Sequence, residues 1–284
     1  MNNALEIRNL SKTYKDFSLD SVSFTLPAGY IMGFVGQNGA GKTTTIRLIL
    51  NMADRTGGEV KIFGSDNIKD ELTVKQELAA VFDEIFFVDV WRVREVEKAV
   101  KGFYNQWDSG RFNGYLNKFK LPPDKKVKEL SRGMKLKLML AVAMSHNAKL
   151  LILDEPTSGL DPVARDELLG ILREYISDGE KSVLFSTHIT SDLEKIADYI
   201  TLIDNGKVFF TGMKRELEEY FLIVKGGEEA LTDALKSQLI GLFSDAAGFS
   251  GMLPSSKSGL LPERVVTETP TIDEILVHIS KGGN

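Results

Sequence analysis

Residues 36–43 read Gly36-Gln37-Asn38-Gly39-Ala40-Gly41-Lys42-Thr43, and the interpretation of the whole chain starts from this motif. An apolar run over residues 30–35 precedes it and predicts a buried strand, whereas residues 44–51 predict a helix. Glycines at this spacing allow a tight turn with its backbone N–H groups directed inward, and the helix that starts there adds a positive dipole. Strand, glycine-rich turn and helix together predict a cradle for phosphate groups.

Each residue of this cradle has an expected role. We expect Lys42 to reach the terminal phosphates of a nucleotide and the hydroxyl of Thr43 to bind Mg²⁺. The alternative, a glycine-rich turn with an incidental lysine, is disfavoured by the flanking strand and helix. The other residues expected to contact the nucleotide are Gly36, Asn38, Gly39, Ala40, Gly41 and Thr44.

A second candidate element ends in two adjacent carboxylates. Four apolar residues, 150–153, predict a buried strand, and Asp154 and Glu155 follow it. Ligands of open α/β sheets bind at the carboxyl ends of the strands, so both side chains are expected there. Asp154 is predicted to hold Mg²⁺, and Glu155 to act as general base on an attacking water. Two solvated acids at a strand end are the alternative, which the neighbouring cradle disfavours.

Composition excludes several classes of protein. The 284 residues include 35 Lys and Arg against 40 Asp and Glu, a net charge of −5, and 43% are hydrophobic, which is too apolar for a disordered chain. The absence of cysteine excludes disulfides, thiolate metal sites and cysteine nucleophiles. The longest apolar run has seven residues, 138–144, well short of the roughly 18 that span a bilayer, and the first residues lack the pattern of a signal peptide. We therefore expect a soluble, cytoplasmic chain, and its mild acidity disfavours binding to nucleic acid.

The order of predicted elements indicates an α/β fold. A strand, a 15-residue helix and another strand succeed one another over residues 150–186, as crossover connections in a parallel sheet require. Residues 71–144 are mostly helical in pattern, and Asp204-Asn205-Gly206 predicts a hairpin turn. The expected strands are 4–10, 19–26, 30–35, 150–153, 182–186, 199–203 and 207–210, with a helix over 162–176.

Residues 215–284 differ in sequence pattern from residues 1–214. Residues 220–224 predict a strand, the apolar spacing over 231–242 predicts a helix, and the Gly-, Ser- and Pro-rich stretch 248–262 predicts a loop. Thr271 and Glu274 have capping-box spacing at the start of a last helix. We therefore expect two units, residues 1–214 and a small α+β accessory module over residues 215–284.

Further motifs make the chain resemble the ATP-binding cassette (ABC) ATPases over roughly residues 5–212. Leu130-Ser131-Arg132-Gly133-Met134 is similar to that family's Leu-Ser-Gly-Gly-Gln signature, and residues 156–161 look like its D-loop. His188 follows a predicted strand where the family carries a switch histidine. Tyr14 lies where the family stacks an aromatic ring on adenine. All these landmarks occur in the family's order.

The resemblance implies a fold, a ligand and an assembly. The fold is a P-loop NTPase (RecA-like) core with an antiparallel β subdomain and a helical subdomain at about residues 71–145. The ligands are ATP and Mg²⁺, bound between two cassettes in a homodimer or heterodimer. One protomer supplies the cradle, Asp154, Glu155 and His188, while Ser131 and Gly133 come from the other and close over the γ-phosphate. Lys42, Glu155 and His188 are then the catalytic residues.

Two departures from the family pattern bear on this interpretation. The signature carries Arg132 and Met134 in place of a glycine and a glutamine, and Arg132 could add a cation near the phosphates or pair across the dimer. The family's Mg²⁺-contacting glutamine is replaced here by a carboxylate. The alignment assigns that position to Asp83, with Glu84 as the alternative.

The resemblance also implies a membrane partner. In the family, a short coupling helix of a transmembrane permease docks near residues 82–91, where the chain is rich in aromatic and aliphatic side chains; these could equally fill the core of the helical subdomain. We expect the ATPase subunit of a bacterial exporter of antibiotics, peptides or amphipathic compounds, similar to the bacitracin-exporter and acetoin-utilisation-like group, peripheral at the inner face of the membrane. The alternatives are a soluble cassette ATPase in translation or DNA repair and a regulatory protein that binds ATP without turnover. The docking cluster consists of Phe82, Phe86, Phe87, Val88, Val90 and Trp91.

Overall fold

The computed structural model describes residues 2–84 and 86–282. Its centre is a six-stranded sheet in the order β10-β9-β3-β8-β7-β6. β3, β6, β7 and β8 run parallel, β9 runs parallel to β3, and β10 returns antiparallel to β9. The strands are β3 (Ile31–Val35), β6 (Leu78–Val81), β7 (Leu150–Asp154), β8 (Ser182–Thr187), β9 (Tyr199–Asp204) and β10 (Lys207–Met213).

The register of this sheet brings the functional motifs to one edge. All residues of β3, β7 and β8 are buried, which is why these strands are short apolar runs without polar alternation. Val35 pairs with Thr187, and Asp154 pairs with Ser186. The glycine-rich loop, Glu155 and His188 each follow directly after one of these strand ends. The expected α/β architecture is confirmed.

Three helices adjoin these strands in the chain: α1 (Lys42–Ile49) follows β3, α6 (Pro162–Tyr175) connects β7 to β8, and α7 (Thr190–Ile196) connects β8 to β9. α6 begins with Pro162, and proline is a residue favoured at the first helical position. Asp161 caps it, because its Oδ1 accepts hydrogen bonds of 3.0 Å from the backbone N–H groups of Val163 and Ala164. α1 begins at Lys42, so the cradle lies at a helix N-terminus as the motif predicts.

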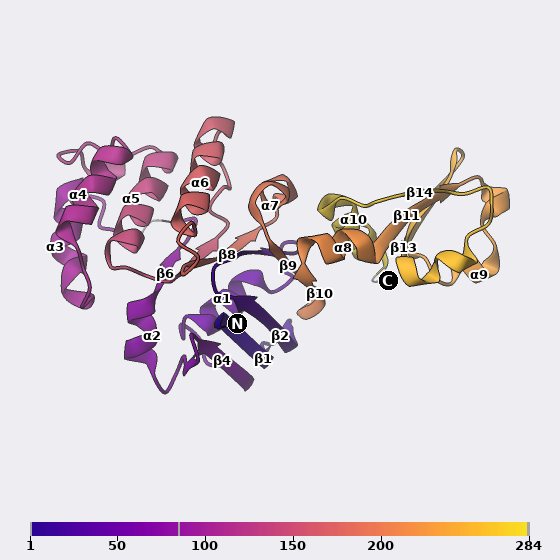
Figure 1. Cartoon of the computed structure of the whole chain (residues 1–284), viewed down its shortest axis with the longest axis horizontal. Helices are drawn as coiled ribbons and strands as arrows, with labels where there is room; N and C mark the ends of the chain where they lie inside the picture. Colours follow the sequence, from indigo (N-terminus) through magenta and orange to yellow (C-terminus); the bar gives the residue numbers. More distant parts are fainter. Residues whose placement is uncertain (1, 85, 283–284) are drawn as a thin grey trace.

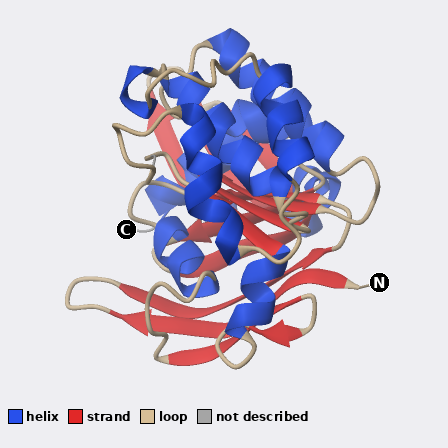
Figure 2. Ribbon diagram, turned by 90° about the vertical axis from the view of Figure 1, so that its left-hand side faces the viewer, coloured by secondary structure: helices blue, strands red, loops and turns tan. Residues whose placement is uncertain are grey.

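A separate antiparallel sheet in the order β2-β1-β4-β5 packs against the face of the parallel sheet opposite α6 (Figures 1 and 2). Phe24 of this sheet meets Phe34 of β3 with ring centroids 5.4 Å apart, inside one hydrophobic core. The strand over residues 57–62 was not expected from the sequence. The strands are β1 (Asn3–Thr13), β2 (Ser18–Pro27), β4 (Gly57–Ile62) and β5 (Ser65–Asp66).

Residues 71–145 contain helices, but they are not helical throughout. After α2 (Glu71–Glu77) the chain enters β6, which pairs with β7 at the edge of the central sheet. Residues 78–81 read Leu-Ala-Ala-Val, a sequence that suits either a buried strand or a buried helix, and pairing with β7 decides between the two. The helices that follow are α3 (Val93–Val100), α4 (Ser109–Lys118) and α5 (Arg132–Ser145).

The C-terminal part forms a third sheet in the order β12-β13-β11-β14. Two expectations for it are wrong. The helix expected over 231–242 is reduced to the four residues of α9 (Asp233–Lys236), and the stretch expected to be a loop contains a seven-residue strand, β13. The strands are β11 (Phe221–Gly226), β12 (Ile240–Asp245), β13 (Gly248–Pro254) and β14 (Val266–Glu268).

A tight hairpin explains both errors. Asp245 pairs with Gly248, so only two residues connect β12 to β13, and Gly248 adopts a φ of +132° that favours glycine. The small and polar residues that resemble a loop are instead held by ladder hydrogen bonds from neighbouring strands. Tertiary pairing therefore overrides the local pattern.

The C-terminal sheet lies at one end of the molecule, far from the helices α3 to α5 at the other end (Figure 1). α8 (Lys214–Tyr220) leads into it, and α10 (Ile272–Gly282) packs against β12, β13 and α7. Ile272 and Ile275 of α10 belong to the same buried cluster as Leu193 of α7. Over the described residues, no helix has the length and apolar character needed to cross a bilayer.

Candidate active site

The Lys42 side chain is buried within the glycine-rich loop, with 6% of its surface exposed. Its Nζ donates hydrogen bonds to the carbonyl oxygens of Gly36, at 2.7 Å, and Gln37, at 3.2 Å. The same atom lies 3.3 Å from Oε1 of Glu155. A buried ammonium is costly without such partners, so this loop and Glu155 together hold a positive charge at the strand ends.

Glu155 joins this lysine to the histidine that follows β8. Its Oε2 lies 2.7 Å from Nδ1 of His188 and accepts a hydrogen bond of 3.3 Å from the His188 backbone N–H. Glu155 has a φ of +52°, a conformation that residues other than glycine rarely adopt and that is concentrated at functional sites. The strained backbone turns the carboxylate out of β7, between Lys42 and His188.

Asp154 meets the requirements of a metal ligand. Its carboxylate is buried, and its Oδ1 has no hydrogen-bond partner among the described residues. Burial raises the pKa of this carboxyl. The neighbouring hydroxyls of Thr43 and Ser186 lower the pKa, but by less. A buried carboxylate oxygen without a partner, next to a threonine hydroxyl, is a donor set that fits Mg²⁺.

A cavity of about 510 Å³ opens over the glycine-rich loop. Lys42, Thr43, Thr44 and Glu155 line it together with Phe17, which the sequence reasoning missed. Phe17 ends the hairpin turn between β1 and β2, and its ring packs so closely on Gly41 that a Cβ there would lie 3.0 Å from Cζ. Other lining residues are Asp16, Gln37, Asn38, Gly39 and Gly41.

Tyr14, expected to stack on adenine, lies in the same hairpin turn. It is 46% exposed, does not line the cavity, and has the Nζ of Lys12 at 5.3 Å from its ring centroid. The exposed ring of Tyr14, three residues before Phe17, is accessible to a base that extends beyond the cavity. The one sequence feature that indicates a role for Phe17 is that it is a second aromatic residue within the β1–β2 turn.

The signature residues are located apart from the cradle of their own chain. Ser131 caps α5, because its Oγ accepts a 3.3 Å hydrogen bond from the backbone N–H of Met134, and its side chain is exposed. Gly133 follows in the first turn. Neither residue lines the cavity over the glycine-rich loop. Within one chain, the two groups of predicted nucleotide ligands do not meet.

Asp83 lies close to the metal candidates in register but not in the cavity. It comes two residues after Val81, which pairs with Leu153 of β7, so the edge strand delivers Asp83 to the same end of the sheet as Asp154. Both Asp83 and Glu84 are exposed. The choice between them stays a prediction.

Comparison with known proteins agrees with this geometry. Residues 19–158 match the model of the ABC transporter family. The bacitracin transport ATP-binding protein BcrA of Bacillus licheniformis is 30% identical over 230 residues, covering 78% of this chain and 74% of its own length. The chain belongs to the ATP-binding subunits of ABC transporters. It therefore binds ATP, and its family is one of ATPases.

Two further matches extend along the chain. The ABC transporter ATP-binding protein YtrB of Bacillus subtilis is 29% identical over 283 residues, 96% of this chain and 97% of its own, so the similarity includes the C-terminal part. A solved ATP-binding subunit of an ABC transporter superposes with a TM-score of 0.69 at 27% identity, covering 76% of this chain and 92% of its own. The ABC ATPase fold and the resemblance to the bacitracin-exporter group are thus confirmed.

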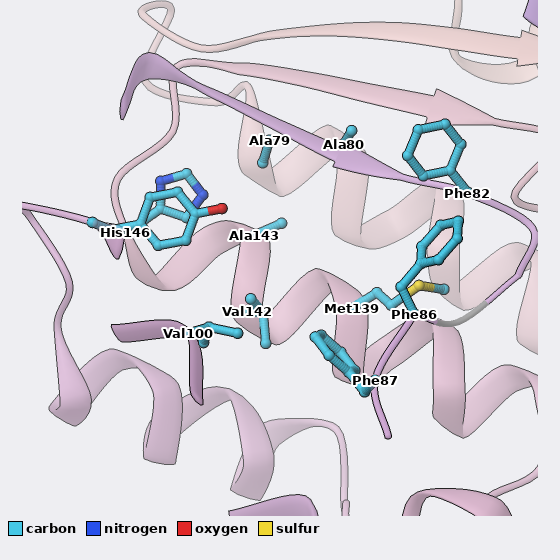
Figure 3. A pocket seen from close by; sticks show the side chains of 11 residues that line it. Ala79, Ala80, Phe82, Phe86, Phe87, Val100, Met139, Val142, Ala143 and His146 are labelled. Atoms are coloured by element: carbon cyan, nitrogen blue, oxygen red, sulfur yellow. The ribbon is translucent and has the colours of Figure 1, made fainter. Parts of the chain in front are cut away.

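The predicted docking cluster borders two adjoining apolar pockets. The first, about 200 Å³, lies between β6 and α5 with Phe82 and Phe86 at one end (Figure 3). At its other end His146 stacks on Tyr104 with ring centroids 3.8 Å apart, and burial lowers the pKa of His146 to about 4. The second pocket, about 470 Å³, shares Ala79, Ala80, Phe82 and Tyr104 with the first and is also lined by Met52, Leu72 and Phe103.

Exposure divides the docking cluster into two groups. Phe86 is 70% exposed, Val90 60%, and Val88 is also exposed. Phe87 and Trp91 are partly buried against the large core that α5 shares. Phe87 and Trp91 thus contribute to the core, as one alternative predicts, whereas docking of a coupling helix on the exposed side chains stays a prediction.

Proposed function

We propose that this subunit hydrolyses ATP in a Mg²⁺-dependent reaction and thereby drives a separate transmembrane permease. The observation that carries the proposal is the chain of contacts from Lys42 through Glu155 to His188, 3.3 Å and 2.7 Å long, beside the unpartnered Oδ1 of Asp154. One site thus offers a cation for phosphate, a base for water and a metal ligand.

The residues act on ATP in the following way. The backbone N–H groups of the glycine-rich loop and the start of α1 bind the β- and γ-phosphates. Lys42 exchanges its contact with Glu155 for the phosphates, which leaves the Glu155 carboxylate free to take a proton from the attacking water. His188 donates a hydrogen bond to the γ-phosphate and loses that partner after hydrolysis.

Mg²⁺, when bound, neutralises charge on the phosphates, and Thr43 and Asp154 are the residues that would hold it, with Asp83 nearby. Phe17 and Tyr14 from the β1–β2 turn cover the base. These assignments place every reacting group at the carboxyl ends of β3, β7 and β8.

We further propose that two cassettes close head to tail around ATP. The separation of Ser131 and Gly133 from the cavity supports this, because the N-terminus of a 14-residue helix, capped by a serine and exposed, offers N–H donors to an anion that its own chain does not supply. ATP binding would close the pair, and hydrolysis would reopen it.

The apolar pockets next to β6 support docking of a permease helix. Leu72 and Phe103 are 83% and 75% exposed and line the larger pocket, where a helix with bulky apolar anchors could bury them. Because BcrA is named for bacitracin transport, we propose an exporter of an antibiotic, peptide or related amphipathic compound. The subunit would then bind at the inner face of the membrane, with residues 1–214 as cassette and residues 215–284 as accessory module.

Phosphate release by the purified full-length chain tests the proposal. We expect ATP turnover with Mg²⁺ and none with EDTA. Glu155→Gln should bind ATP, lose roughly 100-fold or more in turnover because the base is absent, and accumulate as an ATP-dependent dimer on a sizing column. Wild-type turnover in Glu155→Gln would contradict the assignment of the base, and a parent chain that binds ATP without turnover would favour the regulatory alternative.

A further inference from the structure

Arg132, the unusual residue of the signature, lies against the D-loop of its own chain. Gly159 in that loop has a φ of +66°, and a Cβ built on it would lie 3.2 Å from both Cζ and Nη1 of Arg132 and 3.4 Å from Nε. A side chain at position 159 would therefore crowd the guanidinium, which would have to shift by a few tenths of an ångström. The positive φ also disfavours residues other than glycine there.

These three distances also show which side of the guanidinium faces the loop. An approach along the edge of the planar group would bring one nitrogen much closer than the central carbon. Instead Cζ is as close as Nη1, so Gly159 lies under the face of the guanidinium. Stacking of this kind is open to arginine, whose charged group is flat, and not to lysine.

The loop beneath Arg132 is continuous with the catalytic carboxylate. The backbone N–H of Ser158 donates a 3.2 Å hydrogen bond to the carbonyl of Glu155, and that of Leu160 donates a 3.1 Å bond to the carbonyl of Thr157. Leu160 is buried between α5 and α6, whose first turns adjoin, since a Cβ on Gly133 would lie 3.6 Å from that of Ala164. The short, turned segment 155–160 thus links Glu155 at its start to Gly159, which lies next to Arg132.

Arg132 is poorly placed for helix stability. It is the first residue of α5, where the helix dipole disfavours a cation by about 0.3–1 kcal/mol. Among the ion pairs found in the described part of the chain, none involves Arg132. Its position over Gly159 of the D-loop therefore distinguishes this arginine from the other cations of α5.

We propose that Arg132 is a positioning residue that holds the D-loop of its own protomer, and through it the backbone of Glu155, in the conformation required for hydrolysis. This rests on the proposed role of Glu155 in ATP turnover. The structure assigns to the arginine a contact within its own chain, which differs from a direct contact with the nucleotide of the partner.

A spin label on the D-loop of the full-length protein separates these two roles. The chain has no cysteine, so Ser158→Cys gives a single labelling site. We expect Arg132→Met to increase the mobility of this label at least two-fold in the nucleotide-free protein, and Arg132→Lys to do the same, because neither side chain can stack. Lys135→Met, which removes a cation from the same helix turn, should leave the label as in the parent.

Kinetics without the label give the second readout. Arg132→Met should lower kcat about 10-fold while KM and the Kd for ATP stay within two-fold, since the cradle of the chain is untouched. Unchanged label mobility in Arg132→Met would overturn the proposal, as would an equal effect of Lys135→Met. A parent protein without turnover would contradict the proposed function but leave the mobility result decisive for Arg132.

Discussion

The glycine-rich loop and the start of α5 both offer N–H donors at a helix N-terminus, but they differ in what surrounds them. Lys42 at the first is buried and bound by two carbonyl oxygens and Glu155. Ser131 at the second is exposed, and its side chain caps its own helix. In the proposed function, the first binds the phosphates of ATP in its own chain, and the second meets the nucleotide of a second cassette.

Because of this difference, mutations in the two motifs are expected to change different quantities, ATP binding in one case and turnover in the other. If the proposed arrangement holds, a residue of the cradle contributes to ATP binding in the single chain. A residue at the start of α5 then contributes only when a second cassette presents its nucleotide. Binding measured on monomers and turnover measured on dimers therefore separate the two regions.

The largest effect is expected from comparing Lys42→Ala with Ser131→Ala. Loss of Lys42 removes charge-assisted hydrogen bonds to phosphate and should weaken ATP binding roughly 10- to 100-fold. Ser131→Ala should leave the Kd of the monomer within two-fold and lower kcat roughly 100-fold, as loss of a transition-state donor does. Isothermal titration and phosphate release measure these quantities. A Ser131→Ala chain with weakened monomeric binding would contradict the division into two regions.

A smaller effect is expected at the β1–β2 turn. Phe17→Ala should weaken ATP binding about 10-fold, because stacking of a base on an aromatic ring is worth about 1–3 kcal/mol. Tyr14→Ala should have an effect of the same kind if the exposed ring also covers the base. Inorganic triphosphate is the control ligand, since it has no base and should bind both variants like the parent. Equal losses of affinity for triphosphate and ATP would show that these aromatic residues shape the glycine-rich loop and do not stack on the base.

The smallest effect concerns the metal. Asp83→Gln should shift the Mg²⁺ concentration that gives half-maximal turnover several-fold upward, since an amide is a weaker ligand than a carboxylate. Glu84→Gln is the matched control one residue away. An unchanged Mg²⁺ titration in Asp83→Gln would exclude a role at the metal, and a shift only in Glu84→Gln would transfer that role to Glu84.

Much of the site could be predicted from the sequence because its parts are local. The glycine-rich loop, Asp154 with Glu155, and His188 each follow a short apolar strand, and parallel strands bring their ends together without further information. Phe17 escaped prediction because its place depends on how a hairpin folds over α1. The position of Arg132 over Gly159 depends on how α5 packs against α6, which no local pattern shows.

The C-terminal sheet was least predictable for a related reason. Helical spacing over 231–242 and a Gly- and Ser-rich stretch after it are both local signals, whereas β12 and β13 are stabilised by pairing with each other and with β11. Strand propensity depends on neighbours in the sheet, which a single sequence does not show. By contrast, the fully buried strands of the central sheet carry their own apolar signal.

Complementation between two inactive chains shows whether one ATP site is built from two protomers. Lys42→Ala and Ser131→Ala chains are mixed after each has been shown to have lost turnover. In a mixed dimer both defects can fall in one site, leaving the other intact, so random mixing should restore about one quarter of the parent's sites. Recovery of activity on mixing is the predicted result. A mixture no more active than the sum of its two components would contradict a site shared between two protomers.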